Sequence, residues 1–323
     1  MDSFRVIRAE DASEELCKAI SSIDPVAEEY ASSVWRSIKA AQMMEDRWQL
    51  FEMFCWNYDR YSEGLESYVN DCVMTAVRCA GVEQVFQRTR IDVNCFAVNL
   101  ISSGVTLTES LRCFMRAEVD EGNPDRQQFE NWLEDLFDKG GVYALLAKLR
   151  DEAQHGQPLV SLYVDERGRF RACFDLDQLM NPEHFTIKGS FKRLMKDKLN
   201  QMDDLDARHH RLSYTWCMER YFIEVMEVVA TFYSCSSAYI QEGDKLLYDC
   251  IKANPACCGE LKDGRKVIWV LDGEVAHPLI GVETPGYEVH TERKGEVENR
   301  LENAKRRFNR IVSEAAGPSG QSV

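Results

Sequence analysis

Residues 221–240, YFIEVMEVVATFYSCSSAYI, form the most apolar stretch of the sequence. The stretch predicts the buried part of a long helix that runs from about Ala207 to Ile240. Glu224 and Glu227 interrupt it, and their spacing places both on one helix face, which Thr231 continues. Two buried carboxylates can act as an acid/base pair. We expect instead a polar stripe that faces solvent or pairs with a Lys or Arg elsewhere in the chain.

Helical signals also dominate the chain before this stretch, over residues 1–155. Asn123-Pro124 predicts a helix start, because Asn caps the first turn and the N–H that Pro lacks is not needed there. Thr106 and Glu109 have the spacing of a capping box and predict the start of another helix. The first half is therefore expected to hold six or more helices joined by short loops.

Strand signals are confined to the second half. Residues 159–164 and 170–174 are rich in strand-forming residues and flank a short turn that contains Gly, which predicts a hairpin. A second β segment is expected at Lys266–Leu271, followed by a loop over 274–292. The last amphipathic helix is predicted at Glu296–Ala315.

The predicted fold class is therefore mostly α. A multi-helix N-terminal region precedes an α+β region with a small β-hairpin element, and a C-terminal amphipathic helix follows. As domains, we expect a helical domain over 1–155, an α+β domain over 156–292, a basic amphipathic helix over 293–316 and a disordered tail over 317–323.

Composition limits the class of protein. The 39 basic and 54 acidic residues give a net charge of −15, which argues against a generally basic nucleic-acid binder. The 12 cysteines follow a polar N-terminus without a secretory signal, so we expect free thiols in a reducing, cytoplasmic compartment. We find no uncharged apolar window of about 18 residues, so no membrane span is expected.

Charge is unevenly distributed along the chain. Residues 1–150 hold 16 basic and 26 acidic residues, whereas residues 293–310 hold seven basic and three acidic residues. A basic helix can dock on an acidic surface, and the acidic half of another copy offers one. The basic residues that crowd two turns of this helix are Lys305, Arg306, Arg307 and Arg310.

A second basic segment spans residues 188–211. Basic residues with interleaved aromatic residues can hold single-stranded RNA, although several aspartates dilute the charge of this segment. Its candidate contact residues are Lys192, Arg193, Lys196, Arg208 and Arg211.

The same region carries the strongest metal-like pattern of the sequence, Asp203, Asp204, Asp206 and His209. Carboxylates and imidazoles at short spacing can bind Mg²⁺, Mn²⁺ or Zn²⁺. Aspartates also cap helices, and we interpret the segment as a capping loop with no metal and no cofactor. Common nucleotide-binding and hydrolase motifs are absent from the sequence.

The leading hypothesis is a non-enzymatic intracellular interaction protein that self-associates through its basic C-terminal helix. The aromatic run Trp48–Tyr58 offers additional surface for a partner. The first alternative is RNA binding through the basic segments 188–211 and 293–310. The second is a metal-dependent all-α enzyme that uses the aspartate-rich loop.

Overall fold

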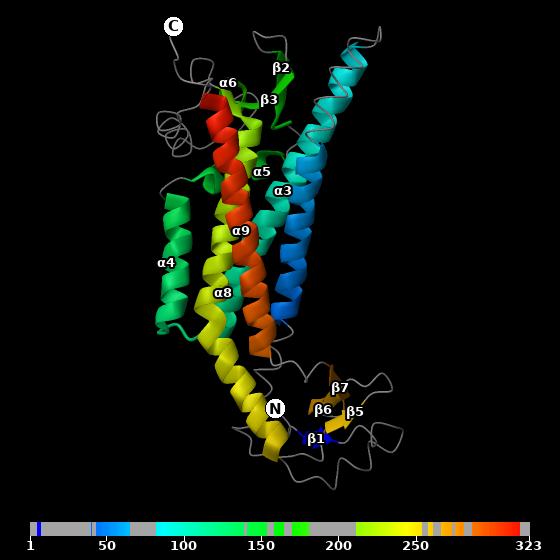
Figure 1. Cartoon of the computed structure of the whole chain (residues 1–323), viewed down its shortest axis with the longest axis vertical. Coiled ribbons are helices and arrows are strands. Elements are labelled where there is room, and N and C mark those ends of the chain that lie inside the picture. The colour runs from blue at the N-terminus through cyan, green and yellow to red at the C-terminus, as the bar shows by residue number, and fades with distance from the viewer. Residues whose placement is uncertain are drawn as a thin grey trace. The chain divides into compact units, whose positions relative to one another are not determined.

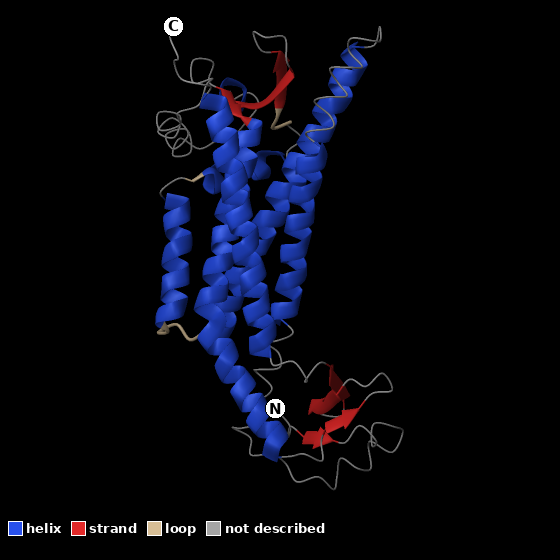
Figure 2. Ribbon diagram, in the orientation of Figure 1, coloured by secondary structure: helices blue, strands red, loops and turns tan. Residues whose placement is uncertain are grey.

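The computed structural model confirms a mostly α protein with small β elements (Figure 1, Figure 2). Two units of contacting residues make up the chain. The first combines residues 1–47, 113–127 and 232–296, and the second combines 48–112, 128–231 and 297–323. The structure describes residues 5–7, 40, 43–64, 82–138, 141–153, 158–164, 170–180, 211–253, 258–260, 266–272, 275–280 and 286–316. The predicted tail over 317–323 lies outside these residues, and the domain boundaries at 155 and 292 stay predictions.

Long helices lie side by side in the second unit (Figure 1). They are parts of a helix over residues 43–64, of α3 (Val82–Glu118), of α8 (Tyr214–Ala253) and of α9 (Gly286–Ala316). The apolar stretch that begins at Tyr221 lies in α8, and its side chains as far as Val229 are largely buried, as predicted. Burial of such a stretch on several sides is what holds neighbouring helices to α8.

Aromatic rings fill the space between these helices. The Phe54 ring stacks on Phe222 with centroids 5.1 Å apart, and the Tyr58 ring stacks on the same residue at 3.6 Å. Of the aromatic residues between 48 and 61, Trp56 alone is mostly exposed, with 59% of its surface accessible. The aromatic run is thus mainly core, and Trp56 is the part that remains available to a partner.

The start of α8 differs from the prediction. Residues Arg211–Ser213 form strand β4, which pairs antiparallel with β3 (Phe170–Asp175). The helix therefore begins at Tyr214 rather than near Ala207, because the backbone before it is hydrogen-bonded in a sheet. Strand β2 (Ser161–Val164) completes the order β2-β3-β4, and its pairing with β3 confirms the predicted hairpin.

The predicted break in α3 is wrong. Thr106 and Glu109 lie inside a continuous helix, and no capping box opens there. Within this continuous helix, the hydroxyl of the nearby Thr108 donates a hydrogen bond to the Val105 carbonyl at 3.0 Å. Buried apolar residues on both sides of the expected break keep the helix continuous, because packing of a long stripe outweighs a local capping signal. These residues are Leu100, Ile101, Leu107 and Leu111.

The helix start at Asn123-Pro124 is confirmed. Helix α4 spans Pro124–Asp138, and the Asn123 side chain accepts a hydrogen bond from the Asp125 N–H at 2.8 Å. Helix α5 follows at Val142–Ala153, directly after Gly141. A short helix, α6 (Leu176–Met180), comes after β3.

The first unit contains an antiparallel sheet. Strand β6 (Lys266–Asp272) pairs with β7 (Val275–Ile280) along one edge. On its other edge, the first half of β6 pairs with β5 (Cys258–Glu260) and the second half pairs with β1 (Arg5–Ile7). Two predictions are wrong here. Residues 5–7 are a strand within the region expected to be helical, and the expected loop over 274–292 contains β7 and the start of α9.

Candidate functional site

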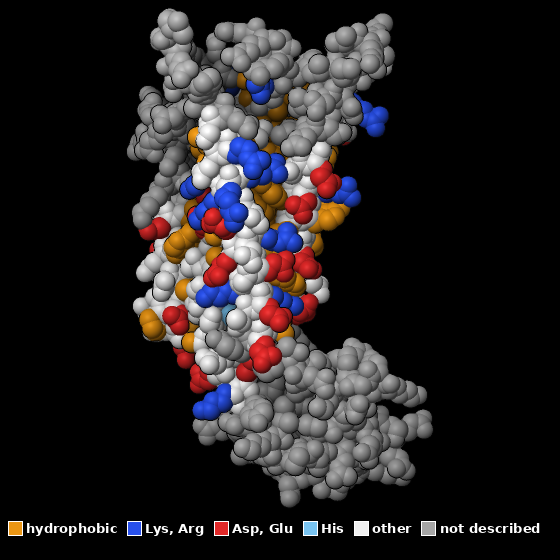
Figure 3. Space-filling view, in the orientation of Figure 1, with side chains coloured by type: hydrophobic (Ala, Val, Ile, Leu, Met, Phe, Trp, Pro, Cys, Tyr) orange, Lys and Arg blue, Asp and Glu red, His pale blue; other side chains and the backbone are white. Residues whose placement is uncertain are grey.

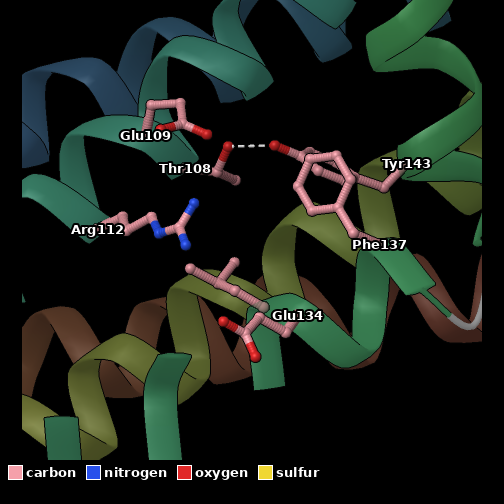
Figure 4. Close-up of a pocket in the computed structure, with 7 residues that line it drawn as sticks. Thr108, Glu109, Arg112, Glu134, Phe137 and Tyr143 are labelled. Carbon is pink, nitrogen blue, oxygen red and sulfur yellow. Dashed lines mark hydrogen bonds between the residues drawn. The ribbon is translucent and has the colours of Figure 1, made fainter. Parts of the chain in front are cut away.

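The second unit contains a cavity of about 270 Å³ between α3, α4 and α5 (Figure 4). Its volume is below the usual range of pockets for drug-sized ligands and suits a group about the size of a side chain. The cavity is lined by Thr108, Glu109, Arg112, Leu133, Glu134, Phe137 and Tyr143.

Helical spacing explains how these side chains meet. Glu109 and Arg112 are three residues apart on α3, and Leu133 and Phe137 are four residues apart on α4, so each pair shares one helix face. Tyr143 lies in the first turn of α5 and closes the cavity from a third helix. Figure 4 shows α3 contributing Glu109 and Arg112 on one side and α4 contributing Glu134 and Phe137 on the other.

Glu224 of α8 holds the α5 end of the cavity in place. Its buried carboxylate accepts a hydrogen bond from the Tyr143 backbone N–H at 2.6 Å and from Arg220 Nε at 3.0 Å. A Cβ on Gly141 would lie 2.7 Å from the Glu224 carboxylate, so glycine permits this approach. Burial raises the pKa of Glu224, while the Tyr143 N–H and Arg220 act in the opposite direction. The carboxylate thus positions a helix, and its charged partner is Arg220, one turn earlier in the same helix.

The Tyr143 side chain is fixed from three sides. Its ring stacks on Tyr221 with centroids 5.7 Å apart and meets Phe137 edge-on at 5.2 Å. The Thr108 hydrogen is directed at the Val105 carbonyl, so the Tyr143 O–H donates to Thr108 across 2.5 Å. Burial raises the pKa of Tyr143 to about 12, which keeps the phenol neutral at neutral pH.

The charges around the cavity favour a cation. Arg112 Nε is already paired with Glu130 Oε2 at 3.0 Å, while Glu109 and Glu134 are exposed. Arg150 also acts on the pKa of Tyr143, so these three carboxylates and two guanidiniums leave one uncompensated negative charge. The charges of Glu109 and Arg112 also act on the pKa of Tyr143 in opposite directions, which places both near its hydroxyl.

Three of the four basic residues predicted on the C-terminal helix form ion pairs within the chain, and two of these pairs join α9 to α8. Lys305 Nζ lies 2.8 Å from Glu227 Oε1, and Arg307 Nη2 lies 3.1 Å from Glu219 Oε1. Arg306 pairs with Glu302 one helical turn away in a largely exposed position. Arg310 is exposed and forms no ion pair with a residue that the structure describes.

Arg307 belongs to a buried polar cluster. The Tyr58 hydroxyl donates to Glu219 at 2.6 Å, and the Arg307 guanidinium lies 5.7 Å from the centre of the Tyr58 ring. Arg307 also donates to the Ser62 hydroxyl. Burial raises the pKa of the Glu219 carboxyl, and the Tyr58 hydroxyl and Arg307 oppose that shift. Arg307 therefore joins α9 to α8 and to the helix over 43–64.

Only one residue of the second basic segment is described. The Arg211 guanidinium lies 4.5 Å from the centre of the Tyr163 ring, a cation–π contact that ties β4 to β2. Lys192, Arg193, Lys196 and Arg208 lie outside the described residues. So do the weak metal candidates Asp203, Asp204, Asp206 and His209, and the described part of the chain has no cluster of three or more potential metal ligands.

The cysteines whose side chains the structure describes are free thiols, as expected. Among the described residues, Cys55, Cys95, Cys113, Cys173, Cys217 and Cys235 are all unbonded. The segment Phe86–Glu118 of α3 is long and apolar enough to cross a membrane by length and composition alone. A core helix passes the same test, and the apolar stripe of α3 is buried against its neighbours.

No protein-family model, curated protein or solved structure matches this chain. The site is therefore defined by its own geometry. The cavity residues were not among those predicted, because no spacing in the sequence brings α3, α4 and α5 together. The i, i+4 pair Leu133 and Phe137 was visible only as part of an amphipathic helix.

Proposed function

We propose that the protein is a non-enzymatic interaction protein that self-associates, with the basic end of α9 (305–310) on the acidic face of α4 of a second copy. We define the acidic face of α4 by Glu130, Glu134 and Asp135. The observation that carries the proposal is the opposite charge of two helices. Helix α4 holds five acidic residues and one basic residue, whereas residues 305–310 hold four basic residues and no acidic one.

Exposure identifies which basic residues are free to reach another molecule. The Arg306 side chain is 68% exposed, and its pair with Glu302 contributes little because both groups lie in water. Arg310 is exposed, and nearby Val312 is an exposed apolar residue. Lys and Arg side chains gather over the upper part of α9 in Figure 3. A contact made by Arg306, Arg310 and Val312 combines attraction with some apolar burial.

Charge reversal tests this proposal better than truncation of the helix. Val297 and Ala304 are buried, so removal of α9 would expose the core of the second unit. We expect R306E/R310E to weaken self-association at least about tenfold while the fold persists. Light scattering across a concentration series measures the oligomer, and circular dichroism checks the helices.

R88E is a control for reversal of an exposed arginine, since Arg88 lies on α3 and belongs to neither proposed face. It should self-associate like the natural protein. The proposal is wrong if the natural protein is a monomer at all concentrations, or if R306E/R310E assembles unchanged. A monomer that binds single-stranded RNA with steep salt dependence would favour the RNA alternative instead. That alternative has less support, because Lys305 and Arg307 are already paired with carboxylates.

A further inference from the structure

We propose that the cavity between α3, α4 and α5 receives the Arg310 side chain of a second copy. This inference rests on the proposed self-association and assigns its central contact. Glu134 belongs both to the lining of the cavity and to the acidic face of α4, so the cavity lies within the proposed interface.

The shape of the cavity fits one arginine side chain. Its volume of about 270 Å³ is too small for a nucleotide-sized ligand. The aromatic and aliphatic walls suit the methylene stem of arginine, and a guanidinium stacks well on an aromatic ring. These walls are Leu133, Phe137 and Tyr143.

The charge pattern selects a cation. Glu109 and Glu134 are exposed carboxylates at the cavity, and either can accept two parallel hydrogen bonds from a guanidinium. The Tyr143 hydroxyl is neutral and its hydrogen is directed at Thr108, so it adds no competing charge. Arg112 is neutralised by Glu130, which leaves no unpaired cation in the lining for an anionic ligand.

Arg310 is the best candidate among the four basic residues of the basic end of α9. Lys305 and Arg307 are held by Glu227 and Glu219 of α8. Arg306 has a neighbouring carboxylate in Glu302, whereas Arg310 has no ion-pair partner among the described residues. Its transfer into the cavity therefore breaks no described pair.

A double-mutant cycle tests the contact. We expect E109Q/E134Q and R310Q each to weaken self-association about tenfold, and the combined variant to lose little more. Sedimentation velocity over a concentration series gives the dissociation constants. E121Q/E298Q removes the same number of exposed carboxylates outside the lining of the cavity and should leave the dissociation constant unchanged.

A small probe tests the cavity directly. N-acetyl-arginine amide should compete with self-association at millimolar concentration, whereas the uncharged citrulline analogue should not. The competition should disappear in E109Q/E134Q. R310K should recover only part of the affinity, because an ammonium group does not form the paired hydrogen bonds of a guanidinium.

The outcomes separate this inference from the proposed function. If E109Q/E134Q assembles like the natural protein while R306E/R310E does not, the cavity assignment is overturned and self-association stands. Additive losses in the double-mutant cycle also overturn the assignment. If the natural protein is monomeric, both proposals fail, and probe binding that depends on Glu109 and Glu134 would then point to a partner other than a second copy.

Discussion

At the scale of single residues, Glu224 and Glu227 differ more than their shared helix face suggests. Glu227 pairs with Lys305 of another helix and is partly exposed. Glu224 is buried, caps the first turn of α5 and pairs with Arg220. The sequence predicted a stripe that faces solvent or pairs with a Lys or Arg elsewhere in the chain; Glu227 has such a partner on another helix, whereas the partner of Glu224 is on its own helix. The sequence did not indicate that one carboxylate would stabilise a helix start, since that contact joins residues far apart in the chain.

His290 of the first unit is a second buried polar residue with a defined environment. Its Nε2 lies 2.9 Å from the Tyr233 carbonyl, so this nitrogen carries the hydrogen and donates it. Its Nδ1 is buried and has no hydrogen-bond partner among the residues that the structure describes. Burial lowers the pKa of His290, and Lys294 and Arg293 lower it further, although the bond to Tyr233 acts in the opposite direction. The folded protein therefore holds this imidazole neutral.

We predict that His290 makes the protein less stable as the pH falls below about 6.5, the pKa of unfolded histidine. Below that pH the unfolded chain binds a proton that the folded chain rejects, so the free energy of unfolding decreases, by at most about 1.4 kcal/mol per pH unit. Urea unfolding at pH 7 and pH 5 measures this loss. H290Q should lose less over the same interval.

The comparison with H290Q isolates the histidine from other groups. Burial raises the pKa of Glu219 and of Glu224, so the folded state binds protons there above the usual carboxyl pKa and gains stability as the pH falls. The natural protein and H290Q share this gain in stability, so it cancels when the two are compared. An equal pH dependence of natural protein and H290Q would show that His290 does not titrate as argued.

At the scale of elements, α3 shows how packing overrides local signals. Gly104 lies inside this helix, where glycine is ordinarily unfavourable. A Cβ at this position would lie 2.5 Å from the Tyr221 hydroxyl oxygen and 3.0 Å from the Phe54 ring. The Tyr221 hydroxyl donates to the Ile101 carbonyl at 2.8 Å, so its ring cannot move freely. Glycine thus allows α3 to approach α8 closely.

We predict that G104A destabilises the protein by about 1–3 kcal/mol, because overpacking outweighs the better helix propensity of alanine. G295A is the matched control. Gly295 also lies inside a helix, α9, but a Cβ there would meet nothing within 4 Å. It should stabilise the protein by about 0.5–1 kcal/mol. Chemical unfolding measures both, and stabilisation by G104A would contradict the close approach.

At the scale of the whole molecule, the net charge of −15 combines faces of opposite sign. In the proposed self-association, the acidic α4 of one copy would attract the basic end of α9 of another, while the remaining acidic surface would repel other contacts. The composition excludes a generally basic molecule, and the distribution of charge permits one specific contact.

We predict that self-association weakens about tenfold when NaCl rises from about 0.05 M to about 0.5 M, because salt screens exposed charges. Light scattering at several salt concentrations measures the effect. The free energy of unfolding should change much less, since the Glu219 carboxylate that Arg307 pairs with is buried and therefore poorly screened by salt. Self-association that strengthens with salt would instead indicate an apolar interface.

The sequence by itself determined the helical class, the hairpin and the start of α4 at Asn123-Pro124, because periodicity and capping act over a few neighbouring residues. Only the tertiary structure decided that α3 continues through Thr106, that Arg307 meets Glu219, and that three helices enclose a cavity. Those outcomes depend on distances between segments far apart in the chain, and packing of the whole core sets such distances.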